Sequence, residues 1–354
     1  MNKKLLTAVT TLALTAGVFG TTFAADKPAV KILATGGTIA GSAPSNTQMT
    51  GYKAGALGID VLINAVPQMK DVAVVSWEQV ANIGSQDMTN DVWLKLADRC
   101  NKLLAQDDVK GVVITHGTDT LEETAYFLNL VVKSDKPVVL VGAMRPATAI
   151  SADGPVNLLN AVKLAASPKA VGKGVLVAMN DQIDGGRDVT KTNTTNVATF
   201  KSPELGALGY FTGGEPYFYK ESLRKHTKNT VFNVSGLKEL PRVDIVYTHV
   251  NDDRVLVDAA VKAGAKGIVY AGSGMGSIHK DAEPGLAEAV KKGVTVVRAS
   301  RVGNGMVVEG SKEWTDEGFL NGDNLNPQKA RVLLQLALTK TSDPKAIQKM
   351  FDEY

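Results

Sequence analysis

The chain has 354 residues, a formal net charge of +3 and a single cysteine, Cys100. A charge this small argues against electrostatic capture of nucleic acid or an anionic membrane, so we expect small molecules and copies of the chain itself as partners. One cysteine excludes an intrachain disulfide, and the fold must therefore be held together by packing.

The N-terminus has the features of a secretory signal peptide. Two lysines precede an apolar run from Leu5 to Gly20, and small residues stand before a cleavage site near Ala24/Ala25. The run is shorter than the roughly 20 residues that a helix needs to span a bilayer. We therefore expect residues 1–24 to be removed and the mature protein to be periplasmic or secreted.

The rest of the chain predicts an α/β fold. Short apolar runs rich in β-branched residues alternate with longer amphipathic stretches, a pattern typical of a parallel sheet covered by helices on both faces. The expected strands are Val30–Ala34, Val72–Ser76, Val112–Thr115, Val138–Val141, Val175–Ala178, Val243–Thr248, Gly267–Ala271 and Val294–Ala299.

About 330 residues are too many for one comfortable core, so we expect two domains. The alternation breaks from Thr212 to about Pro241, where Gly213-Gly214 and mixed aromatic and charged residues show no periodicity. A larger N-terminal domain with a mostly parallel sheet flanked by helices should precede a smaller C-terminal α/β domain. The predicted divisions are a signal peptide (1–24), an N-terminal domain (25–219), a linker (220–240) and a C-terminal domain (241–354).

Two of the expected strands run directly into turns that carry threonines beside glycines. These turns are TGGT at residues 35–38 and THGTDT at residues 115–120. Ligands of open α/β sheets bind beyond the carboxyl ends of the strands, so these turns are where chemistry is expected. Thr120, followed three residues later by Glu123, also predicts a capping box at the start of the next helix.

The sequence offers no motif for a nucleotide, a serine nucleophile or a metal. It lacks G-x-G-x-x-G after the first strand, and it has neither G-x-x-x-x-G-K-[ST] nor G-x-S-x-G. No metal-ligand spacing connects the four histidines, which are His116, His226, His249 and His279. We therefore expect neither a metal nor a cofactor.

A threonine nucleophile remains, and its hydroxyl needs a nearby base or proton relay. Lys191, just past the fifth expected strand, would reach the same rim of the sheet and could act as that base if partly desolvated. His116 stands beside Thr118 but precedes the turn glycine, which favours a hydrogen bond to the loop over a catalytic role.

Four segments carry a resemblance to a known family: ATGGTIAG (34–41), ITHGTDTLEE (114–123), MRPATAISADGP (144–155) and LNPQKARVLLQL (325–336). They resemble segments of the bacterial type II L-asparaginases, secreted homotetramers that hydrolyse asparagine and, to varying degrees, glutamine. The four segments span nearly the whole mature chain, and the first two together are highly specific.

The resemblance implies roles for the catalytic residues. Thr38 would be the nucleophile, activated by Tyr52 from a mobile loop, and the segment Ser42–Gly58 has the composition of such a loop. Thr118 would be a second threonine, coupled to Lys191 in a proton relay, and Asp119 would complete the catalytic set.

The resemblance also implies how substrate is held. The carboxylate of Asp119 would pair with the α-ammonium group, with Ser85 and Gln86 completing the site. Thr118 would contact substrate as well.

A neighbouring subunit of the homotetramer would contribute two further groups. The first matches Ser277. The second is a glutamate, but the spacing of the glutamates in the loop 305–319 differs from that of the family. Of Glu309, Glu313 and Glu317, we predict that Glu313 has this role.

The implied function is that of an L-asparagine amidohydrolase, which forms L-aspartate and ammonia through an acyl-enzyme on threonine. A dual glutaminase-asparaginase is the nearest alternative, because one methylene is worth only about 1 to 3 kcal/mol of discrimination. Relatives with strong glutaminase activity tend to carry Glu where this chain has Gln86, which favours asparagine. A periplasmic amino-acid-binding protein is the alternative from another class, but binding alone requires no nucleophile.

Overall fold

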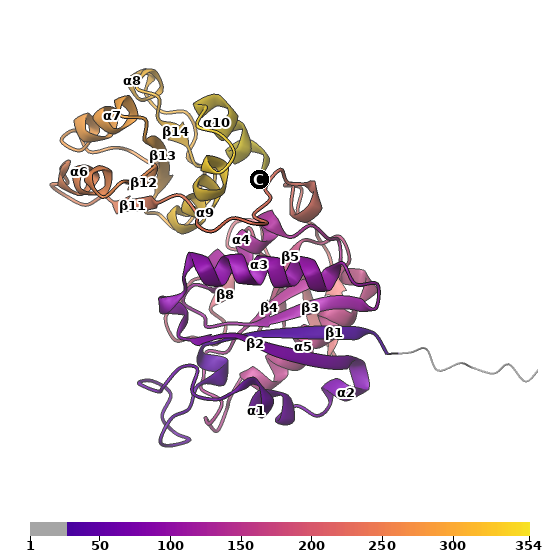
Figure 1. Cartoon of the computed structure of the whole chain (residues 1–354). Helices are drawn as coiled ribbons and strands as arrows, with labels where there is room; N and C mark the ends of the chain where they lie inside the picture. Colours follow the sequence, from indigo (N-terminus) through magenta and orange to yellow (C-terminus); the bar gives the residue numbers. More distant parts are fainter. Residues whose placement is uncertain (1–26) are drawn as a thin grey trace, which may run out of the picture.

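The structure, a computed structural model, describes residues 27–354 (Figure 1). The predicted signal peptide, residues 1–24, and its cleavage site near Ala24/Ala25 lie outside the described residues. Within residues 27–354, no helix combines the length and the apolar character needed to cross a membrane.

The N-terminal half of the described chain forms an eight-stranded sheet in the order β10-β9-β6-β5-β4-β3-β1-β2. Its strands are β1 (Ala29–Gly36), β2 (Val74–Ile83), β3 (Val109–Thr115), β4 (Val138–Val141), β5 (Val175–Met179), β6 (Gln182–Gly185), β9 (Gly209–Thr212) and β10 (Glu215–Phe218). The strands from β5 to β2 are parallel, whereas β6, β9 and β10 pair antiparallel. The expected mostly parallel sheet is confirmed.

Helices cover both faces of this sheet, as Figure 1 shows for α3 and α5. The helices are α1 (Ile59–Asn64), α2 (Met69–Val72), α3 (Asn90–Leu104), α4 (Leu121–Val131) and α5 (Gly154–Ala166). Alternate strand residues enter two cores: Val112 packs with α3 and α4, and Val113 packs with α1, α2 and α5. Cys100 of α3 is fully buried, which raises the pKa of its thiol to about 12 and makes it inert.

Strand β2 differs from the expected Val72–Ser76. Val72 ends α2, and the strand runs from Val74 to Ile83 along the edge of the sheet. Most side chains of this edge strand are half-buried or exposed. The second half of β2 includes polar residues, so it does not stand out as an apolar run. The strand predicted from apolar residues therefore ends too early, at Ser76.

Gly213-Gly214 do not begin the connection between domains. They form the tight turn of the hairpin between β9 and β10, with φ values of 62° and 77°. A two-residue turn with both φ angles positive matches the twist of the flanking strands, and glycine adopts it without strain. A two-stranded ladder follows β6 in the chain, between β7 (Thr190–Lys191) and β8 (Phe200–Lys201).

The C-terminal part of the described chain forms a four-stranded, parallel sheet in the order β11-β12-β13-β14. Its strands are β11 (Val243–Tyr247), β12 (Gly267–Gly272), β13 (Thr295–Ser300) and β14 (Leu320–Asn321). Its helices are α6 (Val255–Lys262), α7 (Glu283–Lys291), α8 (Lys312–Asp316), α9 (Pro327–Leu338) and α10 (Pro344–Glu353). Helices α6 and α7 pack on one face of the sheet, and α9 and α10 pack on the other.

Helix α9 lies where the two halves of the molecule meet (Figure 1). Asn326 caps it by accepting a hydrogen bond from the N–H of Lys329, and Pro327 occupies its first turn. Its buried face contacts α4 on one side and β12 on the other. Residues of all three elements, among them Tyr126, Leu333 and Val269, belong to one continuous core.

Candidate active site

The two threonine-bearing turns meet at the edge where neighbouring strands end. Because β1 and β3 pair in parallel, their carboxyl ends reach the same edge of the sheet. There the chain turns at Gly37 and at Gly117, and a Cβ built on Gly37 would lie 2.2 Å from the Cα of Gly117. Only glycines permit this approach of two backbones. The contact brings Thr38 and Thr118 to one place.

A cavity of about 520 Å³ opens at this edge. Seven of the residues predicted from the sequence line it: Thr38, Tyr52, Ser85, Gln86, Thr118, Asp119 and Lys191. They come from the turns after β1, β2 and β3, from the loop that carries Tyr52, and from β7. The predicted residues Ser277 and Glu313 do not line it.

Thr38 and Tyr52 form one pair of hydroxyls in the cavity. Thr38 begins η1 (Thr38–Ala40), and its Oγ1 lies 2.7 Å from the phenolic oxygen of Tyr52. Two backbone hydrogen bonds of 3.1 Å between Ser42 and Lys53 fasten the base of the Tyr52 loop. Burial raises the pKa of Tyr52 and outweighs the hydrogen bond to Thr38, which lowers it. The phenol is therefore neutral at neutral pH.

Lys191 connects the two polar side chains that follow β3. Its Nζ donates a hydrogen bond of 3.0 Å to Oγ1 of Thr118 and one of 2.6 Å to Oδ1 of Asp119. The side chain of Lys191 is 17% exposed, whereas that of Asp119 is 59% exposed. The amine is thus mostly enclosed, and the carboxylate stays accessible from the cavity.

Ser85 holds the second threonine turn in place. It begins η2 (Ser85–Asp87), its Oγ accepts the N–H of Asp119 at 3.1 Å, and its carbonyl accepts the hydroxyl of Thr120 at 2.8 Å. The capping box predicted at the start of α4 is therefore wrong, because the Thr120 side chain bonds across to η2 instead. Gln86, next in the chain, is exposed at the rim.

His116 supports the turn from beneath and does not line the cavity. It is fully buried, and Nδ1 lies 2.7 Å from the carbonyl oxygen of Gly117, to which it must donate. Nε2 then accepts from the hydroxyl of Thr124 at 2.9 Å, and that hydroxyl accepts from the indole N–H of Trp93. Burial lowers the pKa of His116 to about 4. The expected loop-supporting role is confirmed.

The residues expected from a neighbouring subunit lie in the C-terminal domain. Ser277 is exposed and closes a turn with Ser273 through backbone hydrogen bonds of 3.1 and 2.7 Å. Glu313 and Glu309 are exposed, and Glu317 is half-buried. A side chain that completes the site of another subunit has to be exposed in this way. The roles of Ser277 and Glu313 in a neighbouring site stay predictions.

Other residues of the cavity wall were not singled out from the sequence: Met49, Thr50, Gly51, Ala54, Met144, Arg145, Thr194 and Thr195. Asp153 holds one part of this wall, because its carboxylate accepts the backbone N–H groups of Met144 and Arg145 at 2.9 Å each. In the sequence, only the resemblance of residues 144–155 to a known family pointed to this loop. That resemblance did not assign a function to any single residue of the loop.

Two family models match the chain. The model described as "Asparaginase, N-terminal" matches residues 29–224, and the one described as "Glutaminase/Asparaginase C-terminal domain" matches residues 242–351. The first match covers the eight-stranded sheet, and the second covers the four-stranded sheet.

Individual relatives match over nearly the whole chain. A Bacillus subtilis protein named L-asparaginase 2 is 62% identical over 93% of this chain and 87% of its own length. A Haemophilus influenzae protein named "Probable L-asparaginase periplasmic" is 54% identical over 94% of both chains. The crystal structure of a probable cytoplasmic L-asparaginase from Campylobacter jejuni is 57% identical, with a TM-score of 0.91 over 93% of this chain and 100% of the other.

Proposed function

The chain belongs to the asparaginase family, and from this membership we propose that it hydrolyses the side-chain amide of L-asparagine with Thr38 as the nucleophile. One observation carries the proposal: a single cavity joins the Thr38–Tyr52 pair to the group formed by Thr118, Lys191 and Asp119. An amino-acid-binding protein needs only counter-charges for its ligand. Family membership and the paired hydroxyls both argue against that alternative.

In the first half of the reaction, Oγ1 of Thr38 attacks the amide carbon and forms a C–O bond. Backbone N–H groups of the glycine-flanked turns stabilise the oxyanion, an effect worth about 2.7 to 4 kcal/mol per donor in other enzymes. The C–N bond then breaks. The amide nitrogen takes up one proton and leaves as ammonia. Tyr52 relays this proton: its phenol accepts the proton of the Thr38 hydroxyl and donates the phenolic proton to the leaving nitrogen.

In the second half, water attacks the resulting ester and releases L-aspartate. One proton of that water returns to Oγ1 of Thr38, which restores the enzyme. Thr118 is suited to relay it: its oxygen accepts a hydrogen bond from Nζ of Lys191, so its own proton is free to be donated. No metal or cofactor takes part in this scheme.

The charged ends of the amino acid need counter-groups once the cavity closes over it. The accessible carboxylate of Asp119 pairs with the α-ammonium group. Ser85 and Gln86 complete the pocket on this chain, and Ser277 and Glu313 do so from a neighbouring copy in a homotetramer.

The proposed location is outside the cytoplasm. The compared proteins differ in this respect, since one is named periplasmic and another cytoplasmic. The signal-peptide features of residues 1–24 favour export for this chain. N-terminal sequencing of the secreted product tests this, and a mature protein that retains Met1 would contradict it.

Replacing the proposed nucleophile tests the mechanism directly. T38A should lower the rate of ammonia release from asparagine by several orders of magnitude, because no other hydroxyl can take its place at the amide carbon. T35A is the matched control, because the hydroxyl of Thr35 bonds the carbonyl of Thr115 and does not line the cavity. Near-normal ammonia release by T38A would remove Thr38 from the role.

Glutamine hydrolysis is a second candidate activity, because one matching family model is described for both amides. The ratio of kcat/KM for asparagine and glutamine decides between them. We expect asparagine to be favoured, and a ratio near one would instead support a dual glutaminase-asparaginase.

A further inference from the structure

The backbone that leads into Lys191 is held by the C-terminal domain of the same chain. Residues 186–190 connect β6 to Lys191. Nζ of Lys329, on the first turn of α9, donates to the carbonyl of Arg187 at 2.6 Å and also to that of Val189. Lys329 is 2% exposed, so these two carbonyls are its buried partners.

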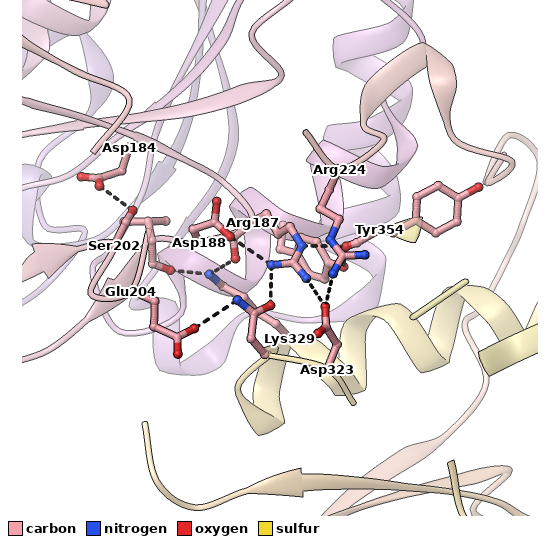
Figure 2. A network of polar contacts seen from close by, with 12 residues as sticks. Asp184, Arg187, Asp188, Ser202, Glu204, Arg224, Asp323, Lys329 and Tyr354 are labelled. Atoms are coloured by element: carbon pink, nitrogen blue, oxygen red, sulfur yellow. Dashed lines mark hydrogen bonds and ion pairs between the residues drawn. The ribbon is translucent and has the colours of Figure 1, made fainter. Parts of the chain in front are cut away.

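Arg187 anchors the start of this segment, as Figure 2 shows. Its guanidinium group donates to Asp323 at 3.1 Å, to Asn324 at 2.8 Å and to the main-chain oxygen of Tyr354 at 2.7 Å. Arg224 bonds the same carboxylate of Asp323 at 2.6 Å. Arg187 is only 4% exposed, so the segment enters the site from a fixed point on the C-terminal domain.

Glu122 anchors the other end of the segment, at Lys191 itself. It lies on the first turn of α4 and is 4% exposed. Its Oε2 accepts the backbone N–H of Lys191 at 2.8 Å. Its Oε1 accepts the side-chain amides of Asn326 at 3.1 Å and Gln328 at 2.5 Å. One carboxylate therefore joins the lysine of the site to the N-terminal turn of α9.

We propose that Glu122, held by Asn326 and Gln328, is a positioning residue that sets the place of Lys191 in the reaction. The inference rests on the proposed function, in which Lys191 works with Thr118. The side-chain bonds from Nζ of Lys191 are 3.0 and 2.6 Å long, so a backbone shift of about 1 Å would break or distort them, and misplacements of that size cost up to about a hundredfold in rate.

Q328E tests the proposal by setting a second carboxylate against Glu122. The repulsion should displace Lys191 and lower kcat for asparagine by roughly tenfold to a hundredfold, with a smaller change in KM. Q348E is the matched control. Gln348 also donates to a carboxylate, that of Asp352 at 3.0 Å, but it has no connection to Lys191. Equal kcat values for Q328E and Q348E would overturn the proposal.

The exchange E122Q/Q328E should restore part of the lost kcat. The amide of residue 122 can then donate to the new carboxylate, while its oxygen still accepts the N–H of Lys191. The rescue is partial because the bond from Asn326 is lost. If Q328E does not fold, Q328M removes the donor without adding charge, and it should lower kcat by a smaller factor. An unchanged kcat in folded Q328M would also overturn the proposal.

The Lys191→Met background shows whether Glu122 acts through Lys191. Q328E should lower kcat in the wild-type background and leave the residual kcat of K191M unchanged, because the group that it displaces is already absent. The same loss in both backgrounds would overturn the positioning role alone. A fully active K191M would overturn the role of Lys191 in the proposed function as well.

Discussion

At the scale of single residues, burial fixes the protonation state of two groups at the site, Tyr52 and His116. It raises the pKa of Tyr52 and lowers that of His116 to about 4, so both side chains are neutral near pH 7. A neutral His116 fits its contacts, because one ring nitrogen donates to Gly117 while the other accepts from Thr124. Protonation would place a charge in the buried turn and would force the Thr124 hydroxyl to rotate and accept.

His116 therefore predicts a loss of stability in acid. Its pKa is about 6.5 when unfolded and about 4 when folded, so the unfolded chain binds the extra proton between these values. The stabilisation is complete above pH 6.5 and is lost as pH falls towards 4, at about 1.4 kcal/mol per unit of pH. Urea unfolding of wild type and H116Q at pH 7 and pH 5 checks this. The stability difference between them should shrink at pH 5, and a constant difference would contradict the assignment.

The hydroxyl-bearing residues of the site can be predicted from the sequence, but the residues that position them cannot. Thr38 and Thr118 follow apolar strands directly, so their place at the sheet edge follows from the pattern. Glu122 gave no such signal. Its partners Asn326 and Gln328 lie about two hundred positions away, and only the packing of α9 against α4 brings them together.

At the scale of elements, the site depends on two turns whose backbones touch. The contact of Gly37 with Gly117 leaves no room for a side chain between the ends of β1 and β3. Gly37 also has a φ of 82°, a conformation that favours glycine. The separation of the two threonines is therefore set by backbone contact.

G37A should separate the turns and lower kcat by about a hundredfold, the cost of an ångström-scale misplacement. G172A is the control: Gly172 has a φ of 75° but open space around its Cβ position, so it carries the backbone strain without the contact. Both variants should lose about 1 to 3 kcal/mol of stability from the positive φ. G37A should lose more, because the ψ of −170° at Gly37 lies in a region essentially restricted to glycine and the new Cβ meets Gly117. Wild-type kcat in G37A would show that the contact does not position the threonines.

The sequence predicts strands best where they are buried on both faces. Strands β1, β3, β4, β5, β12 and β13 are recognisable as apolar, mostly buried runs, whereas the edge strand β2 is apolar only in part. The antiparallel strands β6, β9 and β10 are four residues each, and they mix polar and glycine residues with apolar ones. Their pairing depends on the hairpin turn and on the neighbouring sheet, which a pattern of hydrophobic residues does not reveal.

At the scale of the whole molecule, the two sheets share a core. Helix α9 packs against the C-terminal sheet and against α4 of the N-terminal domain. Tyr354 is 1% exposed, and its ring lies 5.1 Å from that of Phe232 between centroids. Tyr126 and Arg187 of the N-terminal domain both donate to the main-chain oxygen of Tyr354. We therefore expect the two domains to unfold together.

Y354A tests this coupling. Removing a buried aromatic ring should cost about 3 to 5 kcal/mol of stability. Variants that retain only Trp93 or only Trp314 report on the N-terminal and C-terminal domains, respectively. Y354A should shift both fluorescence transitions in urea by the same amount. A shift confined to one probe would show that the domains unfold independently.

The contact between Gly37 and Gly117 also divides the cavity into a part that tolerates change and a part that does not. Its floor is two main chains at van der Waals separation, and no replacement residue can tune that dimension. The rim, which includes Met49, Arg145 and Thr194, is made of side chains whose bulk can vary. A library that aims to alter the choice between amides should diversify the rim and leave both glycines untouched.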